Sequence, residues 1–248
     1  MNSVMKKEFG GNFVLSLPSE EIGITEFARC SYLYFQDVLL PKETLSIDEL
    51  KSFTIFLPKV FEEGSITIVE TGDVLNPGDS VQIENREISI KANSEKVRLL
   101  ISGVAGSISE TSSLVITRDE EHYKVSKPWG HELWINGEHP GYALKEVYIE
   151  KGNRTSLQYH NFKEETNILF KGKANLIYQS GDSFDDLGLT ELLPISSIHV
   201  IPKALHRLEA IEDTLLYETS TPHLNDVIRI SDDSQRVDGR ISSEHEGV

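Results

Sequence analysis

The sequence is poor in the features that would cross-link the chain or place it in a membrane. Cys30 is the single cysteine among 248 residues, so no internal disulfide can form, which fits a reducing compartment. No stretch approaches the roughly 18 consecutive apolar residues that a membrane-spanning helix needs. The region after Met1–Lys7 has no apolar run followed by a small-residue cleavage site, so no signal peptide is predicted. We therefore expect a cytoplasmic protein without a membrane partner.

Positive charge is also scarce. The chain has 24 Lys and Arg against 40 Asp and Glu, for a formal net charge of −16. Nucleic acid is not an expected partner, because binding its phosphates requires a basic face. A small anionic substrate stays compatible with this charge, since a local cluster of Lys and Arg can outweigh the global field. The alternative interpretation of the acidity is solubility alone.

Helical patterns are rare, and strand patterns dominate. Short alternating or β-branched runs recur between turn residues. They are Ser65–Glu70, Ser80–Ile83, Glu87–Ile90, Val97–Ile101, Ala143–Ile149, Thr166–Phe170, Ala174–Tyr178, Ile198–Ile201 and Thr214–Glu218. The clearest helix candidate is Ser46–Ser52, with Ser46 as N-cap. Many short strands with regular turns predict an all-β barrel or sandwich.

A faint internal repeat relates two segments of the chain. Val81–Ala92 can be placed under His199–Ala210 so that Ile83 falls on Ile201 and Ile90 falls on Leu208. A fixed offset of this kind suggests two copies of one supersecondary unit. Coincidence is the alternative for a single pair of segments.

Histidine is absent from the first half of the chain. All eight histidines lie beyond residue 121. A first lobe over residues 1–117 would therefore lack imidazole ligands and serve a structural task. The second lobe, residues 118–236, would carry the chemistry, and residues 237–248 are polar enough to predict a poorly ordered tail.

Four residues of the second half have the pattern of a metal site. Gln158 and His160 are two apart, so on a strand their side chains leave the same face, and Glu165 follows within reach. His206 begins another predicted strand, and side chains from different strands converge inside a small barrel. One amide oxygen, two imidazoles and a carboxylate suit a divalent ion such as zinc, iron, manganese, nickel or cobalt. Any single histidine here could be an ordinary barrel residue, but the four together favour one metal ion.

These residues resemble a known family. The spacing Gly-x5-Gln-x-His-x4-Glu-x6-Gly from Gly152 to Gly172 resembles the first cupin motif, with glutamine in place of the first histidine. The second half is similar to type II mannose-6-phosphate isomerase domains in several segments. These are Lys127–Gly130, Lys145–Ile149, Arg154–His160 and Asn225–Arg229. The resemblance implies double-stranded β-helix (cupin, or jelly-roll) barrels, two in tandem as in a bicupin, zinc as the metal, and a homodimer.

The sequence also departs from that family. Its second cupin motif, Pro-x-Gly-x-x-His, is altered to Ile201–His206, and its closing Asp-Asp-Tyr-Gly-Arg becomes Asp232–Arg236. No nucleotidyltransferase domain precedes the barrel in this sequence. These changes affect the prediction of the substrate more than the prediction of the metal site.

The resemblance and the charges together suggest a metal-dependent aldose–ketose isomerase acting on a hexose phosphate. Lys145 and Arg229 are the candidate catalytic residues, Lys145 as proton carrier, with an ion pair to a carboxylate as the alternative for this lysine. Arg154, Lys127 and His131 are the candidate substrate-binding residues. An arginine matches a phosphate bidentately, although a surface salt bridge is the alternative for both arginines.

Two other functions stay open at this point. One is a different cupin enzyme of carbohydrate metabolism, such as an epimerase, lyase or oxygenase, because one fold hosts many reactions. The other is a non-catalytic sugar-binding cupin.

Glu218 is expected to orient His206 from behind the metal site.

Overall fold

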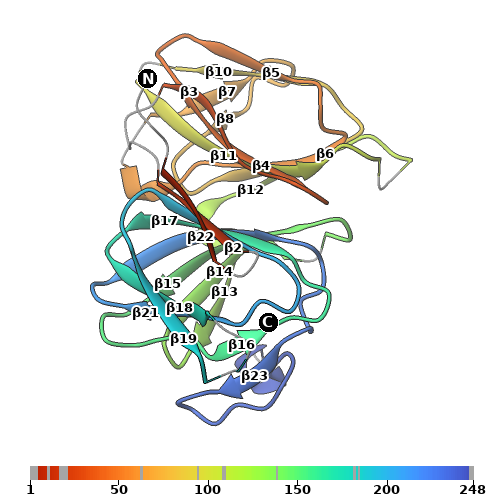
Figure 1. Ribbon diagram of the computed structural model, residues 1–248. Coiled ribbons are helices and arrows are strands. Elements are labelled where there is room, and N and C mark those ends of the chain that lie inside the picture. The colour runs from red at the N-terminus through yellow and green to blue at the C-terminus, as the bar shows by residue number, and fades with distance from the viewer. Residues whose placement is uncertain are drawn as a thin grey trace. The chain divides into compact units, whose positions relative to one another are not determined.

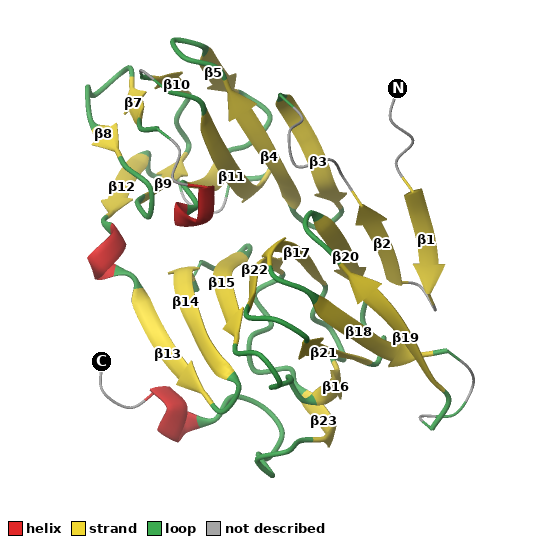
Figure 2. Ribbon diagram, turned by 90° about the vertical axis from the view of Figure 1, so that its left-hand side faces the viewer, coloured by secondary structure: helices red, strands yellow, loops and turns green. Residues whose placement is uncertain are grey.

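The computed structural model is built almost entirely from β-strands (Figures 1 and 2). It describes residues 5–9, 12–16, 22–61, 64–93, 95–107, 110–137, 139–180, 183 and 185–245. Within these residues the helical elements are short 3-10 turns: η1 (Lys59–Phe61), η2 (Asp119–Glu121) and η3 (Ser242–His245). The described residues include no helix of the length and apolar character needed to cross a membrane.

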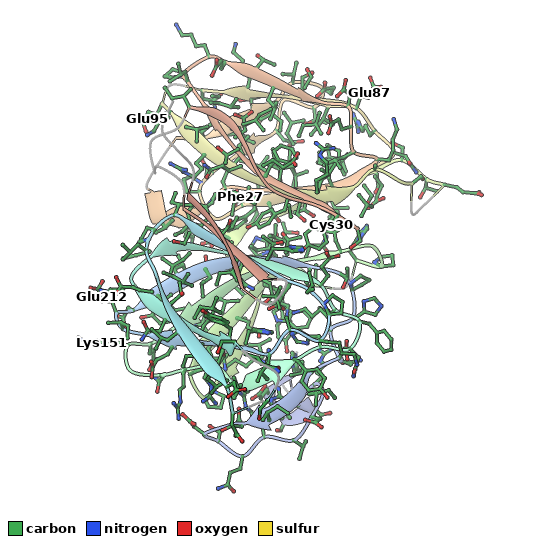
Figure 3. The ribbon with its side chains drawn as sticks, viewed as in Figure 1. Phe27, Cys30, Glu87, Glu95, Lys151 and Glu212 are labelled. Carbon is green, nitrogen blue, oxygen red and sulfur yellow. The ribbon has the colours of Figure 1, made fainter. Side chains whose placement is uncertain are left out.

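The chain divides into two compact units. One unit, here called the first barrel, contains Glu20–His122 together with Ile135–Leu144. The other, the second barrel, contains Met1–Ser19, Tyr123–Trp134 and Lys145–Val248. Exposed acidic side chains lie on both, such as Glu87 and Glu95 on the first barrel and Glu212 on the second (Figure 3).

The first barrel consists of two antiparallel sheets. The larger has the order β12-β9-β6-β11-β4-β3 and the smaller the order β5-β10-β7-β8. The strands of the larger sheet are β3 (Gly23–Arg29), β4 (Leu33–Leu39), β6 (Ser52–Phe56), β9 (Ser80–Glu84), β11 (Val97–Val104) and β12 (Ser113–Thr117). Those of the smaller sheet are β5 (Thr44–Ile47), β7 (Ile66–Ile68), β8 (Val74–Leu75) and β10 (Ile88–Ala92).

The second barrel repeats this plan with added strands. Its larger sheet has the order β1-β2-β20-β17-β22-β15-β14-β13 and its smaller sheet the order β19-β18-β21-β16-β23. The larger sheet contains β1 (Met5–Phe9), β2 (Asn12–Ser16), β13 (Tyr123–Lys127), β14 (Gly130–Asn136), β15 (Ala143–Ile149), β17 (Glu165–Lys171), β20 (Ser196–Val200) and β22 (Thr214–Ser220). The smaller sheet contains β16 (Leu157–Tyr159), β18 (Ala174–Gln179), β19 (Leu187–Leu192), β21 (His206–Ala210) and β23 (Ile228–Ser231).

The two sheet orders match strand for strand. Reading β5-β10-β7-β8 against β16-β21-β18-β19, and β12-β9-β6-β11-β4-β3 against β2-β20-β17-β22-β15-β14, gives the same spatial order twice, with the same order along the chain for every pair except β12 and β2. The predicted all-β fold with two tandem barrels is therefore confirmed. β2 holds in the second barrel the place that β12 holds in the first, so a strand from the start of the chain completes the second barrel's larger sheet.

The register of the repeat needs one correction. Ile88 begins β10 and His206 begins β21, so the fixed offset holds for these two strands. In the preceding strands, however, the core residues are Val81 and Ile83 in β9 but Ile198 and Val200 in β20. Ile83 therefore corresponds to Val200 rather than to Ile201. One additional residue in the loop after β20 accounts for the shift.

Alternating side chains build each core. In β18 the burial pattern alternates strictly, with Ala174, Leu176 and Tyr178 packed inside the barrel. The predicted helix over Ser46–Ser52 is wrong, because the segment forms the end of β5, a turn and the start of β6. Pairing with β10 places Ile47 opposite Ile88, and burial of these apolar side chains outweighs the local capping signal.

The segment expected to be a poorly ordered tail includes a described turn. Up to residue 245 it is described, and it contains η3, whereas residues 246–248 lie outside the described residues. Glu244 of η3 makes ion pairs with Lys127 and Arg236 in the second barrel. Ion pairs, rather than apolar packing, therefore hold the polar residues of η3 against the second barrel.

Candidate functional site

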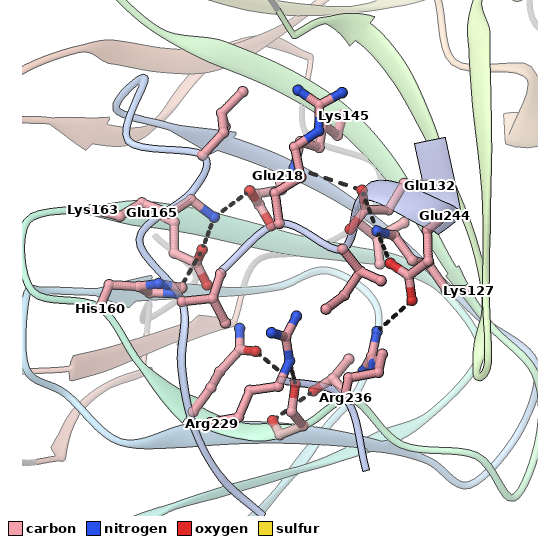
Figure 4. A pocket seen from close by; sticks show the side chains of 18 of the residues that line it. Lys127, Glu132, Lys145, His160, Lys163, Glu165, Glu218, Arg229, Arg236 and Glu244 are labelled. Atoms are coloured by element: carbon pink, nitrogen blue, oxygen red, sulfur yellow. Dashed lines mark hydrogen bonds and ion pairs between the residues drawn. The ribbon is translucent and has the colours of Figure 1, made fainter. Parts of the chain in front are cut away.

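The second barrel contains a pocket lined by charged side chains (Figure 4). Six cations line it: Lys127, Lys145, Lys163, Arg229, Arg236 and Arg240. Four glutamates face them: Glu132, Glu165, Glu218 and Glu244. The pocket thus has a net excess of basic side chains in a chain of net charge −16. A local field of this kind favours an anionic ligand.

At the inner end of the pocket, His160, Glu165 and His206 form a buried cluster. Their ligand atoms all lie within 4.8 Å of one another. His160 follows β16, Glu165 begins β17 and His206 begins β21, so three strands converge as the sequence pattern predicts. Nε2 of His206 lies 3.2 Å from one carboxylate oxygen of Glu165, and Nε2 of His160 lies 3.6 Å from the other.

Backbone carbonyls set the orientation of both imidazoles. Nδ1 of His160 donates to the carbonyl oxygen of Asp226, and Nδ1 of His206 donates to that of Ala204 at 3.0 Å. Because a carbonyl only accepts, each Nδ1 carries a proton and each ring directs its Nε2 toward the cluster. Nε2 of His160 is buried and has no hydrogen-bond partner among the described residues.

These features fit a divalent metal ion. Two imidazole nitrogens and one carboxylate are a common donor set for zinc, iron or manganese. Burial lowers the pKa of His160 to about 4, so this imidazole is neutral near pH 7, as a ligand must be. The orphaned Nε2 atom has the place and orientation of a ligand atom.

Glu165 is kept ionised by an ion pair that the sequence analysis missed. Burial alone would raise the pKa of Glu165, but the ammonium of Lys163, with the two imidazoles, holds it well below its ordinary range. Lys163 contacts one oxygen of Glu165 and lies 2.8 Å from Glu218. Burial opposes the charge of Lys163, yet the two carboxylates outweigh it and raise the pKa of this lysine.

Glu218 therefore has a different role from the expected one. Its carboxylate binds Lys163, while Nδ1 of His206 is oriented by the carbonyl of Ala204. The signal for Lys163 was present in the sequence: it stands two residues before Glu165, and on an extended segment such residues share a face. Nothing in the local sequence, by contrast, indicates that Glu218 would meet it.

Gln158, the fourth predicted ligand, lines the same pocket. It is the cross-strand partner of His206, and its Oε1 accepts a hydrogen bond of 2.8 Å from Ser156 Oγ. The last glycine of the motif, Gly172, has φ +87, and a Cβ there would lie 2.1 Å from the carbonyl oxygen of Asp213. Only glycine fits at that turn, which explains its place in the pattern.

A second charged group lies around Glu132 in the same pocket. Lys127 and Lys145 each lie 3.7 Å from a carboxylate oxygen of Glu132, and Lys145 also lies over the ring of Trp134. Burial would raise the pKa of Glu132, but the charges of Lys145 and Lys127 lower it to about 2. The predicted catalytic lysine and one predicted substrate-binding lysine are thus brought together by a glutamate that the sequence analysis did not single out.

Arg229 also lines the pocket. Its Nε donates to Ser156 Oγ at 3.2 Å, and its Nη1 donates to the backbone carbonyls of Val237 and Gly239. Burial and the neighbouring Arg236 lower the pKa of Arg229. Neutral partners hold this guanidinium in place without neutralising its charge.

Arg154 and His131 have other neighbours. Arg154 makes a two-pronged ion pair with Asp233, at 2.8 and 2.9 Å. The ring of His131 stacks on Tyr148, with centroids 5.0 Å apart. Neither residue is among the described residues that line the pocket.

Comparisons with known proteins agree with this geometry. The family described as mannose-6-phosphate isomerase, C-terminal, matches residues 116–219. No curated protein matches the sequence.

Several solved structures share the fold at low identity. The oxalate decarboxylase of Lactobacillus farciminis, in a formate complex, has a TM-score of 0.61 and 12% identity, over 92% of this chain and 86% of that chain. The protein Ylba from E. coli has a TM-score of 0.66 and 11% identity, over 90% and 95%. Vicilin from tomato has a TM-score of 0.58 and 9% identity, over 81% and 78%.

The strand order repeated in two barrels, the His160–Glu165–His206 cluster and these matches lead to one assignment. The chain has the two-barrel cupin fold, and its second barrel is similar to the C-terminal domain of mannose-6-phosphate isomerases.

Proposed function

We propose that the protein is a metal-dependent isomerase that interconverts the aldose and ketose forms of a hexose phosphate. The observation that carries the proposal is the pairing of two oriented imidazoles with an ionised Glu165 at the end of a cation-lined pocket. A sugar phosphate has both parts that such a pocket can hold, namely oxygens for a metal and an anionic group for the cations.

His160, Glu165 and His206 would hold one divalent ion, with Gln158 as a further ligand and zinc as the first choice over iron, manganese, nickel or cobalt. When bound, this ion would polarise the oxygens on the reacting carbons of the sugar. Lys163 would keep Glu165 ionised and in place.

Lys145 is the proposed proton carrier. Its side chain is mostly buried, and its Nζ lies 3.7 Å from a carboxylate oxygen of Glu132. As a neutral amine, Lys145 would take the proton from C2 of the sugar and deliver it to C1, and Glu132 would hold the amine in position. Arg229, anchored by Ser156 and two carbonyls, would bind an oxygen of the sugar or its phosphate.

Location, assembly and partners complete the proposal. We propose a cytoplasmic homodimer whose ligand is a small sugar phosphate and which binds neither nucleic acid nor membranes. Arg154 and His131 receive no substrate-binding role here, since their neighbours lie outside the pocket lining.

A non-catalytic sugar-binding cupin is the second candidate. The ion pair of Lys163 with Glu165 and Glu218 favours it, because this pair satisfies the buried carboxylates without a metal. Another cupin enzyme, such as an epimerase, lyase or oxygenase, would use the same metal ligands on a different substrate.

Metal analysis combined with an isotope-exchange assay separates these functions. The isomerase predicts about one equivalent of metal, as in a single-ion site, and exchange of the C2 proton of mannose 6-phosphate with solvent, followed by NMR. The Lys145→Met variant should lose exchange by about 100-fold or more while keeping its metal. Metal without exchange on several sugar phosphates would move the assignment to another cupin enzyme. Absence of metal under all loading conditions would favour the binding protein.

A further inference from the structure

Glu244 occupies the part of the pocket that suits an anion. One of its carboxylate oxygens lies 2.8 Å from Nζ of Lys127, and the other lies 3.3 Å from Nη1 of Arg236. All three side chains are largely buried, with exposed fractions of 9% for Lys127 and Arg236 and 12% for Glu244. Figure 4 shows the carboxylate of Glu244 between the two cations. The arrangement is that of a bound anion held at two points.

Each of the two cations has one further carboxylate partner. Lys127 lies 3.7 Å from Glu132, which Lys145 shares, and Arg236 lies 2.7 Å from Asp232. Glu244 is the partner that the two cations have in common. If it moved away, two mostly buried cations would lose part of their compensating charge, which is costly. Another anion entering the pocket would restore the balance.

The segment that carries Glu244 is attached by few apolar contacts. No residue of η3 is completely buried. Its other contacts within the second barrel are polar or involve ring edges: His245 contacts the hydroxyl of Tyr123 at 3.3 Å and lies edge-on to Trp134. Gly239, with φ +77, precedes the segment. Because these contacts are few, the ion pairs of Glu244 carry much of the attachment of η3.

We propose that Lys127 and Arg236 form the subsite for the phosphate group of the ligand, and that Glu244 is an internal competitor for this subsite. The inference rests on the proposed function only for the identity of the ligand as a sugar phosphate. A phosphate presents several charged oxygens, so it can accept from the ammonium of Lys127 and the guanidinium of Arg236 together. Binding of phosphate then displaces Glu244 and releases η3, and the return of Glu244 displaces phosphate.

Calorimetric titration with inorganic phosphate, in the presence of a chelator, tests the exchange. Glu244→Gln keeps the size of the side chain and removes its charge, so phosphate should bind about tenfold more tightly than to the unmodified protein, a gain typical of removing one competing charged contact. Glu212→Gln, an exposed substitution elsewhere on the second barrel, should leave the affinity unchanged. Equal or weaker phosphate binding by Glu244→Gln would overturn the proposal.

A second measurement uses the unmodified protein, in case the variant folds poorly. Arg240 is exposed and precedes η3, so phosphate should accelerate tryptic cleavage after Arg240 by releasing the segment. In Lys127→Met the acceleration should be lost. Protection from trypsin, or no effect of phosphate, would identify η3 as a fixed structural strap. Neither experiment involves metal or turnover, so a failure of the isomerase assignment would leave its result interpretable.

Discussion

The two barrels share a strand order and differ in what fills them. β21 begins with His206 opposite Gln158, whereas β10 begins with Ile88 opposite Ile47. Ile47 and Ile88 belong to the apolar core of the first barrel. The same backbone positions therefore hold a polar cluster in one barrel and an aliphatic core in the other.

The starts of β17 and β6, a second pair of corresponding strands, show the same difference. Glu165 begins β17 and pairs with Val200, and the corresponding inward residue of β6 is Phe53, paired with Ile83. Lys163 and Lys51 each stand two residues earlier, but Lys163 is buried against two carboxylates while Lys51 is exposed. The fold thus supplies positions, and the side chains decide whether they bind a ligand or only pack.

The first barrel also has a polar cluster, but its chemistry is different. Ser52, Glu84 and His139 lie within hydrogen-bond distance of one another. Nδ1 of His139 accepts from the backbone N–H of Gly141, so its Nε2 carries the proton. This imidazole cannot take a proton from Ser52 through Nε2, and the cluster joins the β14–β15 connection to β6 and β9 rather than activating a nucleophile.

The largest expected effect is the loss of metal from the second barrel in Glu165→Gln. The carboxylate supplies the negative charge that a divalent ion requires, so the affinity for metal should fall by about 100-fold or more. Metal content after dialysis checks this by mass spectrometry. Asp37→Asn, which changes a buried carboxylate of the first barrel, should retain the metal of the unmodified protein. Equal metal content in the two variants would show that Glu165 is no ligand.

The buried lysine gives the next effect. Lys163→Met leaves Glu165 and Glu218 buried without their shared counterion, so the second barrel should lose about 3–5 kcal/mol of stability without metal. Both tryptophans, Trp129 and Trp134, lie in the second barrel, so their fluorescence follows its unfolding in urea.

The matched control for that lysine is Lys51→Met. Its side chain is exposed on the first barrel, and the change should stay within about 0.5 kcal/mol, measured by hydrogen exchange. A similar loss in both variants would mean that Lys163 stabilises through its aliphatic chain and not through its charge.

Exchanging the residues at the start of β10 and β21 tests the comparison directly. Ile88→His places an imidazole in an aliphatic core and should cost the first barrel about 2–4 kcal/mol. His206→Ile should cost the metal-free second barrel less than about 1 kcal/mol, because Lys163 still pairs with Glu165. The change also keeps the volume of the side chain roughly constant, which a packed interior tolerates best. Hydrogen exchange of β10 and tryptophan fluorescence measure the two losses. Equal losses of stability would contradict the view that the second barrel tolerates either a histidine or an isoleucine at this position and the first barrel only an isoleucine.

The sequence predicts the fold well because its signals are local. Period-two alternation identified the strands, and the spacing of Gln158, His160 and Glu165 depends on one strand and one turn. His206 could be included because it begins a strand in the repeat. The helix at Ser46–Ser52 failed because β5 pairs with a strand more than 40 residues away, which no local pattern reveals.

Two ion pairs that shape the pocket depend on long-range contacts. Lys163 meets Glu218 across 55 residues, and Lys127 meets Glu244 across 117. In a chain with 40 acidic and 24 basic residues, composition alone allows many pairings. Glu132, Arg236 and Glu244 were not singled out for that reason.

A pH-dependent effect is expected at Asp37, an inward carboxylate of the first barrel. It pairs across the strands with Leu99 of the core, and burial, with the nearby Glu43, raises its pKa from 3.8 to about 6. An acid with a raised folded-state pKa contributes most stability below its unfolded pKa, and this is lost as pH rises from about 4 to 6. Asp37→Asn is neutral at every pH, so it should be more stable than the unmodified protein by about 2 kcal/mol at pH 7.5 and nearly equal at pH 4. Hydrogen exchange of β4 at several pH values measures the difference, with the exposed Glu87→Gln as a control that should show no change. If Asp37→Asn were equally stabilising at pH 4 and pH 7.5, the gain in stability would come from packing and not from removal of a buried charge.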